Sequence, residues 1–143
     1  MRPISRFLII VILLLGSYEF FSVVMSTDAI HKKHLINAYR IVVELGRINK
    51  ERLQIALALG NRHYNPSPRP ELMQGSAVRN LSFEQSGAIR AELDERTGVD
   101  GGVLYYLPLM KNGEISEWTC VTHDYPDVGS FLPQCEYIAK PKD

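Results

Sequence analysis

Both cysteines of the chain lie in the stretch EISEWTCVTHDYPDVGSFLPQCEY (114–137), which decides how the C-terminal part folds. Cys120 ends a run of apolar, β-branched and aromatic residues that is typical of a strand, and Cys135 follows 15 positions later. The pattern favours a disulfide that closes the loop between them. Such a closure would stabilise a small domain by about 3 kcal/mol, because it lowers the entropy of the unfolded chain. The alternative is a pair of buried free thiols in a reducing compartment.

The composition allows one small domain and gives no electrostatic case for general nucleic-acid binding. The 143 residues are 45% hydrophobic and 22% charged, with a formal net charge of zero. Proteins that bind nucleic acid without sequence preference rely on an excess of Lys and Arg. We therefore expect no nucleic-acid binding, unless the chain acts in DNA uptake through a local basic patch.

An apolar run near the N-terminus predicts a membrane anchor. Phe7–Met25 would span roughly 28 Å at about 1.5 Å per residue, and Arg2 and Arg6 precede it. The alternative is a cleavable secretory signal centred on Phe7–Leu15, but a small-x-small cleavage pattern is missing. The sequence thus predicts an uncleaved transmembrane helix within residues 1–30.

Glu19 lies inside this apolar run, and an ionisable residue at membrane depth is by default a functional candidate. The alternative is an interfacial residue, since only about 9 Å of helix separates it from Met25. Basic residues flank both ends of the run, so charge alone does not orient it. A disulfide persists only in an oxidising compartment, which places the rest of the chain outside the cytoplasm.

Residues 31–61 predict an amphipathic helix that continues from the anchor. Apolar residues recur at intervals of three and four, and charged residues occupy the opposite face. Gly60-Asn61 predicts the end of this helix. The proline-rich segment Asn65–Pro70 cannot continue it.

Residues 62–143 predict a globular β domain. Its four expected strands are 77–83, 88–93, 103–110 and 115–121. Short turns join the first two and the last two, and Asn112-Gly113 is a strong hairpin signal. Pro108 predicts an edge or a bulge near the end of the third strand. The fold class is therefore α+β, with the long helix packed on a four-stranded antiparallel sheet and a disulfide-closed C-terminal loop.

Several short motifs follow one another in the order and spacing of the type IV pilin globular domain. They are Val78-Arg79-Asn80-Leu81, Gly87-Ala88-Ile89-Arg90-Ala91, Asn112-Gly113, Trp118-Thr119-Cys120 and Leu132-Pro133-Gln134-Cys135. With the long helix before them, the chain resembles the type IV pilin subunit family. The resemblance implies a structural subunit of a bacterial type IV pilus-like filament, without distinguishing adhesion, motility and DNA uptake.

The resemblance also implies a location, partners and an outward-facing surface. It implies a single-pass protein of the bacterial inner membrane with its C-terminal domain in the periplasm, or an extracellular pilus. The implied partners are other pilin subunits and the pilus assembly machinery. The loop between the cysteines would then lie on the outside, with His123, Asp124 and Tyr125 as the exposed residues that meet partners.

The N-terminus differs from the pilin pattern. Pilin precursors carry a basic leader that ends in glycine just before a phenylalanine, with a glutamate a few positions later. Here Arg6 is followed directly by Phe7, and no glutamate follows within a few positions. This difference keeps an alternative open, in which the chain is a membrane-anchored pilin-like accessory protein that binds pilins or the assembly machinery without polymerising.

An enzymatic function is not expected. His31 and His34 could share a helix face, but two histidines provide too few ligands for a metal site. The His123-Asp124 pair has no nucleophile motif near it, and the sequence contains no glycine-rich phosphate loop, GxSxG or HExxH. We therefore predict no cofactor and no metal.

Overall fold

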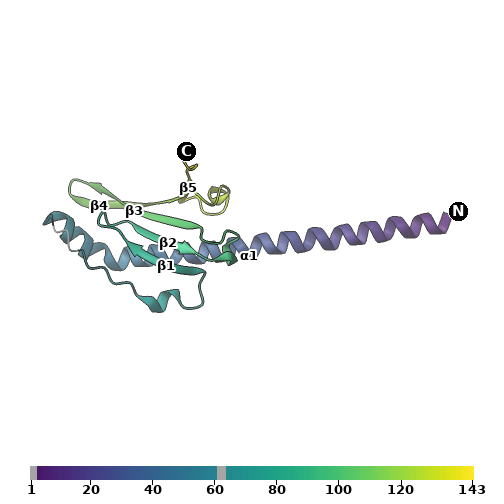
Figure 1. Cartoon of the computed structure of the whole chain (residues 1–143), viewed down its shortest axis with the longest axis horizontal. Helices are drawn as coiled ribbons and strands as arrows, with labels where there is room; N and C mark the ends of the chain where they lie inside the picture. Colours follow the sequence, from purple (N-terminus) through teal and green to yellow (C-terminus); the bar gives the residue numbers. More distant parts are fainter. Residues whose placement is uncertain (1–2, 61–63) are drawn as a thin grey trace.

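The computed structural model describes residues 3–60 and 64–143, and within the first helix it leaves the side chains of residues 3–8 and 18–26 undescribed. The protein is α+β, as predicted, with one long helix against one sheet (Figure 1). The elements in chain order are α1 (Pro3–Ala58), η1 (Pro70–Met73), β1 (Val78–Phe83), β2 (Ile89–Leu93), η2 (Glu95–Thr97), β3 (Val103–Lys111), β4 (Glu114–Thr122), η3 (Val128–Ser130) and β5 (Cys135–Tyr137).

The C-terminal half of α1 packs on the sheet, and the N-terminal half projects away from it (Figure 1). The packed half follows the helical period, since its buried residues are spaced three or four apart and form one stripe. The stripe consists of Leu35, Ala38, Val42, Leu45, Asn49, Leu53 and Ala56. It meets the buried face of β2, β3 and β4, and we refer to the sheet, its loops and this part of α1 as the head.

The predicted membrane anchor is not supported. Among the residues that the structure describes, none belongs to a helix with an apolar stretch long enough to cross a bilayer. The predicted single-pass location in the inner membrane, with the C-terminal domain in the periplasm, is therefore not supported.

The sheet contains five strands in the order β1-β2-β3-β4-β5, whereas the sequence predicted four. The first four strands form the predicted antiparallel meander. The fifth strand, β5, pairs with β4 in parallel, which makes the sheet mixed. A parallel connection needs a crossover of about a dozen residues, and the loop 123–134 supplies it. Pro133 precedes β5 and leaves the amides of Cys135–Tyr137 free to pair.

The β3–β4 hairpin extends beyond the rest of the sheet. The last residue of β3 that pairs with β2 is Tyr106, while pairing with β4 continues to Lys111. Asn112 and Gly113 both have positive φ, 53° and 79°, as the predicted two-residue turn requires. The predicted irregularity near Pro108 is present as a register shift between Leu109 and Met110. Beyond Tyr106 the hairpin is therefore a two-stranded ribbon.

Asn49 ties the connection after α1 back to the helix. Its side chain is fully buried, and its amide nitrogen donates to the carbonyl oxygens of Leu45 and Ser67, at 2.9 and 3.0 Å. Its amide oxygen accepts a hydrogen bond from the Ser67 backbone N–H at 2.6 Å. A buried amide is tolerated in the core because each of its polar atoms has a partner.

Candidate interaction surfaces

The projecting part of α1 carries a bare apolar surface. The side chains of Ile9–Leu15 are between 37% and 65% exposed. We refer to this run as the apolar segment. Proteins rarely leave contiguous large apolar side chains in water unless the surface serves an interaction. A helix that is apolar on all sides is normally buried, in a protein core or in a membrane, so this exposed segment is an interaction candidate.

Glu19 was predicted to be a functional charge within the same helix. The backbone of α1 continues through this position. Its side chain lies outside the described residues, so its role stays a prediction.

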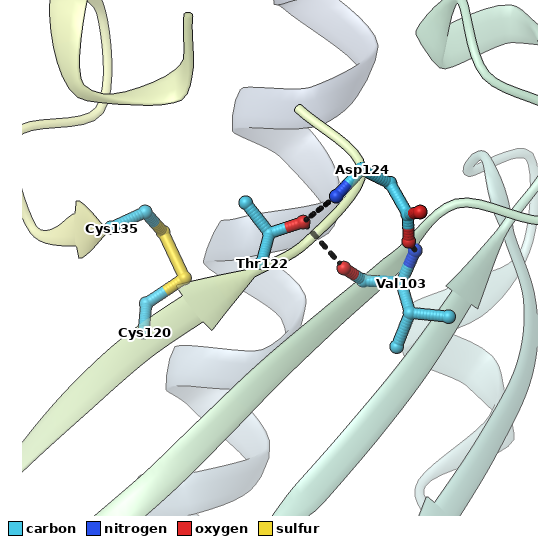
Figure 2. Close-up of a disulfide and its surroundings, with 5 residues drawn as sticks. All are labelled: Val103, Cys120, Thr122, Asp124 and Cys135. Carbon is cyan, nitrogen blue, oxygen red and sulfur yellow. Dashed lines mark hydrogen bonds between the residues drawn. A yellow bond between two sulfur atoms is a disulfide. The ribbon is translucent and has the colours of Figure 1, made fainter. Parts of the chain in front are cut away.

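Cys120 and Cys135 form the predicted disulfide (Figure 2). They face each other across the β4–β5 pair, and their Cα atoms are 4.3 Å apart. Both side chains are buried, so the disulfide is part of the core and is not presented to a partner. It fastens the short edge strand β5 and the loop that contains η3 to the rest of the sheet.

Asp124 belongs to a hydrogen-bonded network beside the disulfide (Figure 2). Its carboxylate accepts a hydrogen bond from the Val103 N–H at 3.0 Å and forms an ion pair with Lys140 at 2.7 Å. The buried Thr122 hydroxyl donates to the Val103 carbonyl oxygen at 2.7 Å and accepts from the Asp124 N–H at 3.2 Å. The Asp124 carboxylate raises the pKa of Lys140. Asp124 therefore holds the end of β4 and the C-terminal tail in place.

His123 and Tyr125 lie on either side of Asp124 and have different surroundings. The His123 Nδ1 is 2.5 Å from the carbonyl oxygen of Ile138, and its ring meets Tyr105 edge-on. Tyr125 is only 6% exposed, and its hydroxyl is 2.6 Å from the Thr97 hydroxyl. Burial raises the pKa of Tyr125. Of the three loop residues predicted to meet partners, Tyr125 is buried and Asp124 is engaged within the head.

A pocket of about 260 Å³ lies where α1 leaves the head. We refer to it as the junction pocket; its walls come from α1, from the loop around η2 and from the loop around η3. Leu35 and Val128 form apolar parts of the wall, while Asp28 and Asp127 contribute carboxylates.

Gly98 lets the η2 loop approach α1 at the junction pocket. Its φ of 92° is in the left-handed region, and a Cβ there would lie 2.9 Å from the Nδ1 of His31. Both features require glycine. His31 is therefore packed against the loop as part of the pocket wall.

A second hollow of about 480 Å³ adjoins this pocket along α1. We refer to it as the helix groove; both hollows are lined by Lys32 and Phe131. Lys32 is paired with Asp28 at 2.8 Å, and its ammonium is 5.5 Å from the centre of the Phe131 ring. The groove also contains the apolar side chain of Ile36 and the cations of Lys33 and Arg40. Within the described part of the chain, neither of these two cations has an ion-pair partner.

The structure offers no metal centre in the residues it describes, since no three His, Cys, Asp or Glu side chains lie close enough to share an ion. His34 lines a different hollow from His31, beside Leu72 and Gln74. Asp127, Phe131 and Thr97 were not predicted from the sequence as parts of a surface feature. Among the pocket residues, only Gly98 gave a local signal in the sequence, because a glycine permits the η2 loop to lie close to α1.

Comparisons of the chain with protein-family models, with curated proteins and with solved structures found no match.

Proposed function

We propose that this protein is a structural subunit of a type IV pilus-like filament, in which the projecting halves of α1 pack against one another and the heads cover them. The observation that carries the proposal is the apolar segment Ile9–Leu15, which is exposed on a helix that extends beyond the head (Figure 1). The order of motifs between Val78 and Cys135, which resembles that of pilins, supports the same assignment.

The energetics favour a polymer over a single weak contact. The Ile, Val and Leu side chains of the apolar segment are about half exposed, so complete burial would contribute roughly 5–10 kcal/mol in all. Association costs about 4–15 kcal/mol in lost freedom of motion. One helix contact is therefore marginal by itself, whereas a bundle in which each helix has several neighbours and the heads also touch is stable.

The test compares two isoleucines of equal exposure on the same helix. Ile12 in the apolar segment is 60% exposed, and Ile55 near the other end of α1 is 61% exposed. Replacement by Gln keeps a good helix former and removes the apolar surface. We expect Ile12→Gln to abolish sedimentable filaments, and Ile55→Gln to leave them unchanged, as measured by pelleting and negative-stain electron microscopy of the purified chain.

Other outcomes would favour a different function. A full-length chain that stays monomeric at high concentration, in wild type and variants alike, contradicts the filament subunit. If that monomer nevertheless binds to filaments of another pilin through the apolar segment, the chain is an accessory protein. Equal effects of the Ile12 and Ile55 variants would show that apolar exposure in general, and not this segment, drives association.

A further inference from the structure

We infer that the tip of the β3–β4 hairpin of one copy docks into the junction pocket and helix groove of the next copy. This inference rests on the proposed filament and names the contact between its heads. The tip comprises Leu109, Met110, Lys111 and Glu114, together with Glu117 opposite Leu109. The contact is head to tail, because the tip and the two hollows lie at opposite ends of the head.

The position of α1 against the sheet shows that these ends are opposite. Residue 31 of α1 lies beside Gly98 in the η2 loop, and residue 53 lies beside Gly87 in the β1–β2 turn. The β3–β4 hairpin extends further in the direction of the β1–β2 turn. Figure 1 shows the hairpin tip at the left end of the head and the η3 loop near the point where α1 emerges on the right. The tip therefore cannot reach the hollows of its own chain.

The tip carries apolar side chains that need a partner. Leu109 and Met110 are 40% and 44% exposed near the turn of the hairpin, whereas Ile115 opposite Met110 is buried. The helix groove offers Ile36 and the Phe131 ring as apolar counterparts. Two exposed apolar residues at the end of a hairpin are suited to contact with an apolar groove.

The charges of the two surfaces are complementary. The tip presents one cation, Lys111, and the two carboxylates of Glu114 and Glu117, all without an ion pair among the described residues. At the other end, Asp127 provides a carboxylate for the lysine. The unpaired Lys33 and Arg40 of the groove provide cations for the two glutamates. Opposite charges on both halves of the surface favour one orientation of docking and disfavour the reverse.

A contact of this kind repeats from copy to copy. The two surfaces differ, so the interface is heterologous, and such interfaces generate rings or open filaments. The part of α1 that belongs to the head runs from about residue 31 to residue 58, which is roughly 40 Å of helix. Copies joined by this contact are therefore offset by about 40 Å along the helix axis, which places the projecting half of one α1 beside the head of the next copy.

Chemical cross-linking of the wild-type chain tests the contact directly. A carbodiimide joins a lysine amine to a carboxylate only when the two touch. We expect a cross-linked peptide pair that contains Lys111 and Asp127 in the assembled protein, identified by mass spectrometry, and none in dilute monomer. The monomer sample is the control for cross-links within one chain.

Charge exchange supplies the second test. Lys111→Asp alone and Asp127→Lys alone should each raise the concentration needed for assembly at least about threefold, and the double variant should restore it to within about twofold. Lys142→Asp, which removes an exposed lysine of the tail, is the matched control and should have no effect. The Asp127 side chain has no hydrogen bond as the cap of η3, so its replacement leaves the fold intact.

The outcomes separate this inference from the proposed function. Suppose that filaments form without the Lys111–Asp127 cross-link, and that the single variants do not change the concentration needed for assembly. This result overturns the hairpin contact but is consistent with the filament subunit. Absence of any assembly by the wild-type chain overturns both. Two single variants whose effects add, with no restoration in the double variant, also contradict direct pairing of these two residues.

Discussion

The two halves of α1 belong to one continuous helix but differ in what covers their apolar residues. In the packed half, the buried stripe from Leu35 to Ala56 meets the sheet. In the projecting half, the side chains of Ile9–Leu15 are exposed and do not belong to the core. The comparison indicates that the packing that stabilises the fold lies in the head, whereas the side chains of the apolar segment remain exposed. Substitutions in the two halves should therefore affect different measurements.

The largest effect on stability is expected from the packed half. Leu45 is fully buried and belongs to the core cluster between α1 and the sheet. Leu45→Ala should lower the free energy of unfolding by about 2–5 kcal/mol, since it removes apolar contact and leaves a cavity. Urea denaturation followed by circular dichroism measures this change. A loss below about 1 kcal/mol would mean that the helix is not held by this contact.

Removal of the disulfide should have an effect of similar or somewhat smaller size. The Cys120→Ser, Cys135→Ser double variant should lose about 3 kcal/mol of stability through the freer unfolded chain. The projecting half does not depend on this bond, so its helical signal should remain. Denaturation of the double variant and of the wild type, side by side, checks the expectation. Wild type treated with reductant serves as the reference for a chain without the disulfide. Equal stability of wild type and double variant under non-reducing conditions would contradict it.

Local signals in the sequence predicted the parts of the head that depend on neighbouring residues. Asn112-Gly113 requires positive φ at both positions, and this alone specifies the hairpin between β3 and β4. The three- and four-residue spacing from Leu35 onward identified the buried face of α1. The cysteine spacing predicted the disulfide, which the structure contains.

Long-range packing decides the features that the sequence did not predict. Tyr125 is buried because the η2 loop brings Thr97 to its hydroxyl, and because Gly102 has no Cβ that would overlap its ring. The parallel pairing of β5 arises from the path of the loop before it, which no local sequence signal specifies. The junction pocket joins three segments that are distant in sequence, and no single segment indicates it.

A pH-dependent effect should distinguish the head from the projecting helix. Tyr106 stacks on Trp118 with ring centres 4.9 Å apart and meets Tyr39 edge-on. Burial raises its pKa from 10.0 to about 12. The folded head thus favours the neutral phenol, so this contribution is complete below pH 10 and is lost as the pH rises through about 12. The loss is on the order of 2 kcal/mol.

Denaturation of the head at a series of alkaline pH values measures this loss. Tyr106→Phe should be less sensitive to pH between 10 and 12 than the wild type, because it removes one ionising phenol from the core. Part of the dependence should remain, since burial also raises the pKa of Tyr39 and Tyr125. Identical alkaline profiles for variant and wild type would contradict the role of Tyr106.

The smallest effect on stability is expected from the projecting half. Leu13 is 65% exposed, so Leu13→Ala should change the free energy of unfolding by less than about 0.5 kcal/mol. Alanine also keeps the helix, because its helix propensity is the highest of all residues. The matched comparison is Leu45→Ala, the same change in the packed half. If the apolar segment acts in assembly, Leu13→Ala should weaken filament formation while the unfolding curve of the monomer stays that of the wild type. A monomer destabilised as much as Leu45→Ala would show that the segment packs within its own chain and is not a surface for other copies.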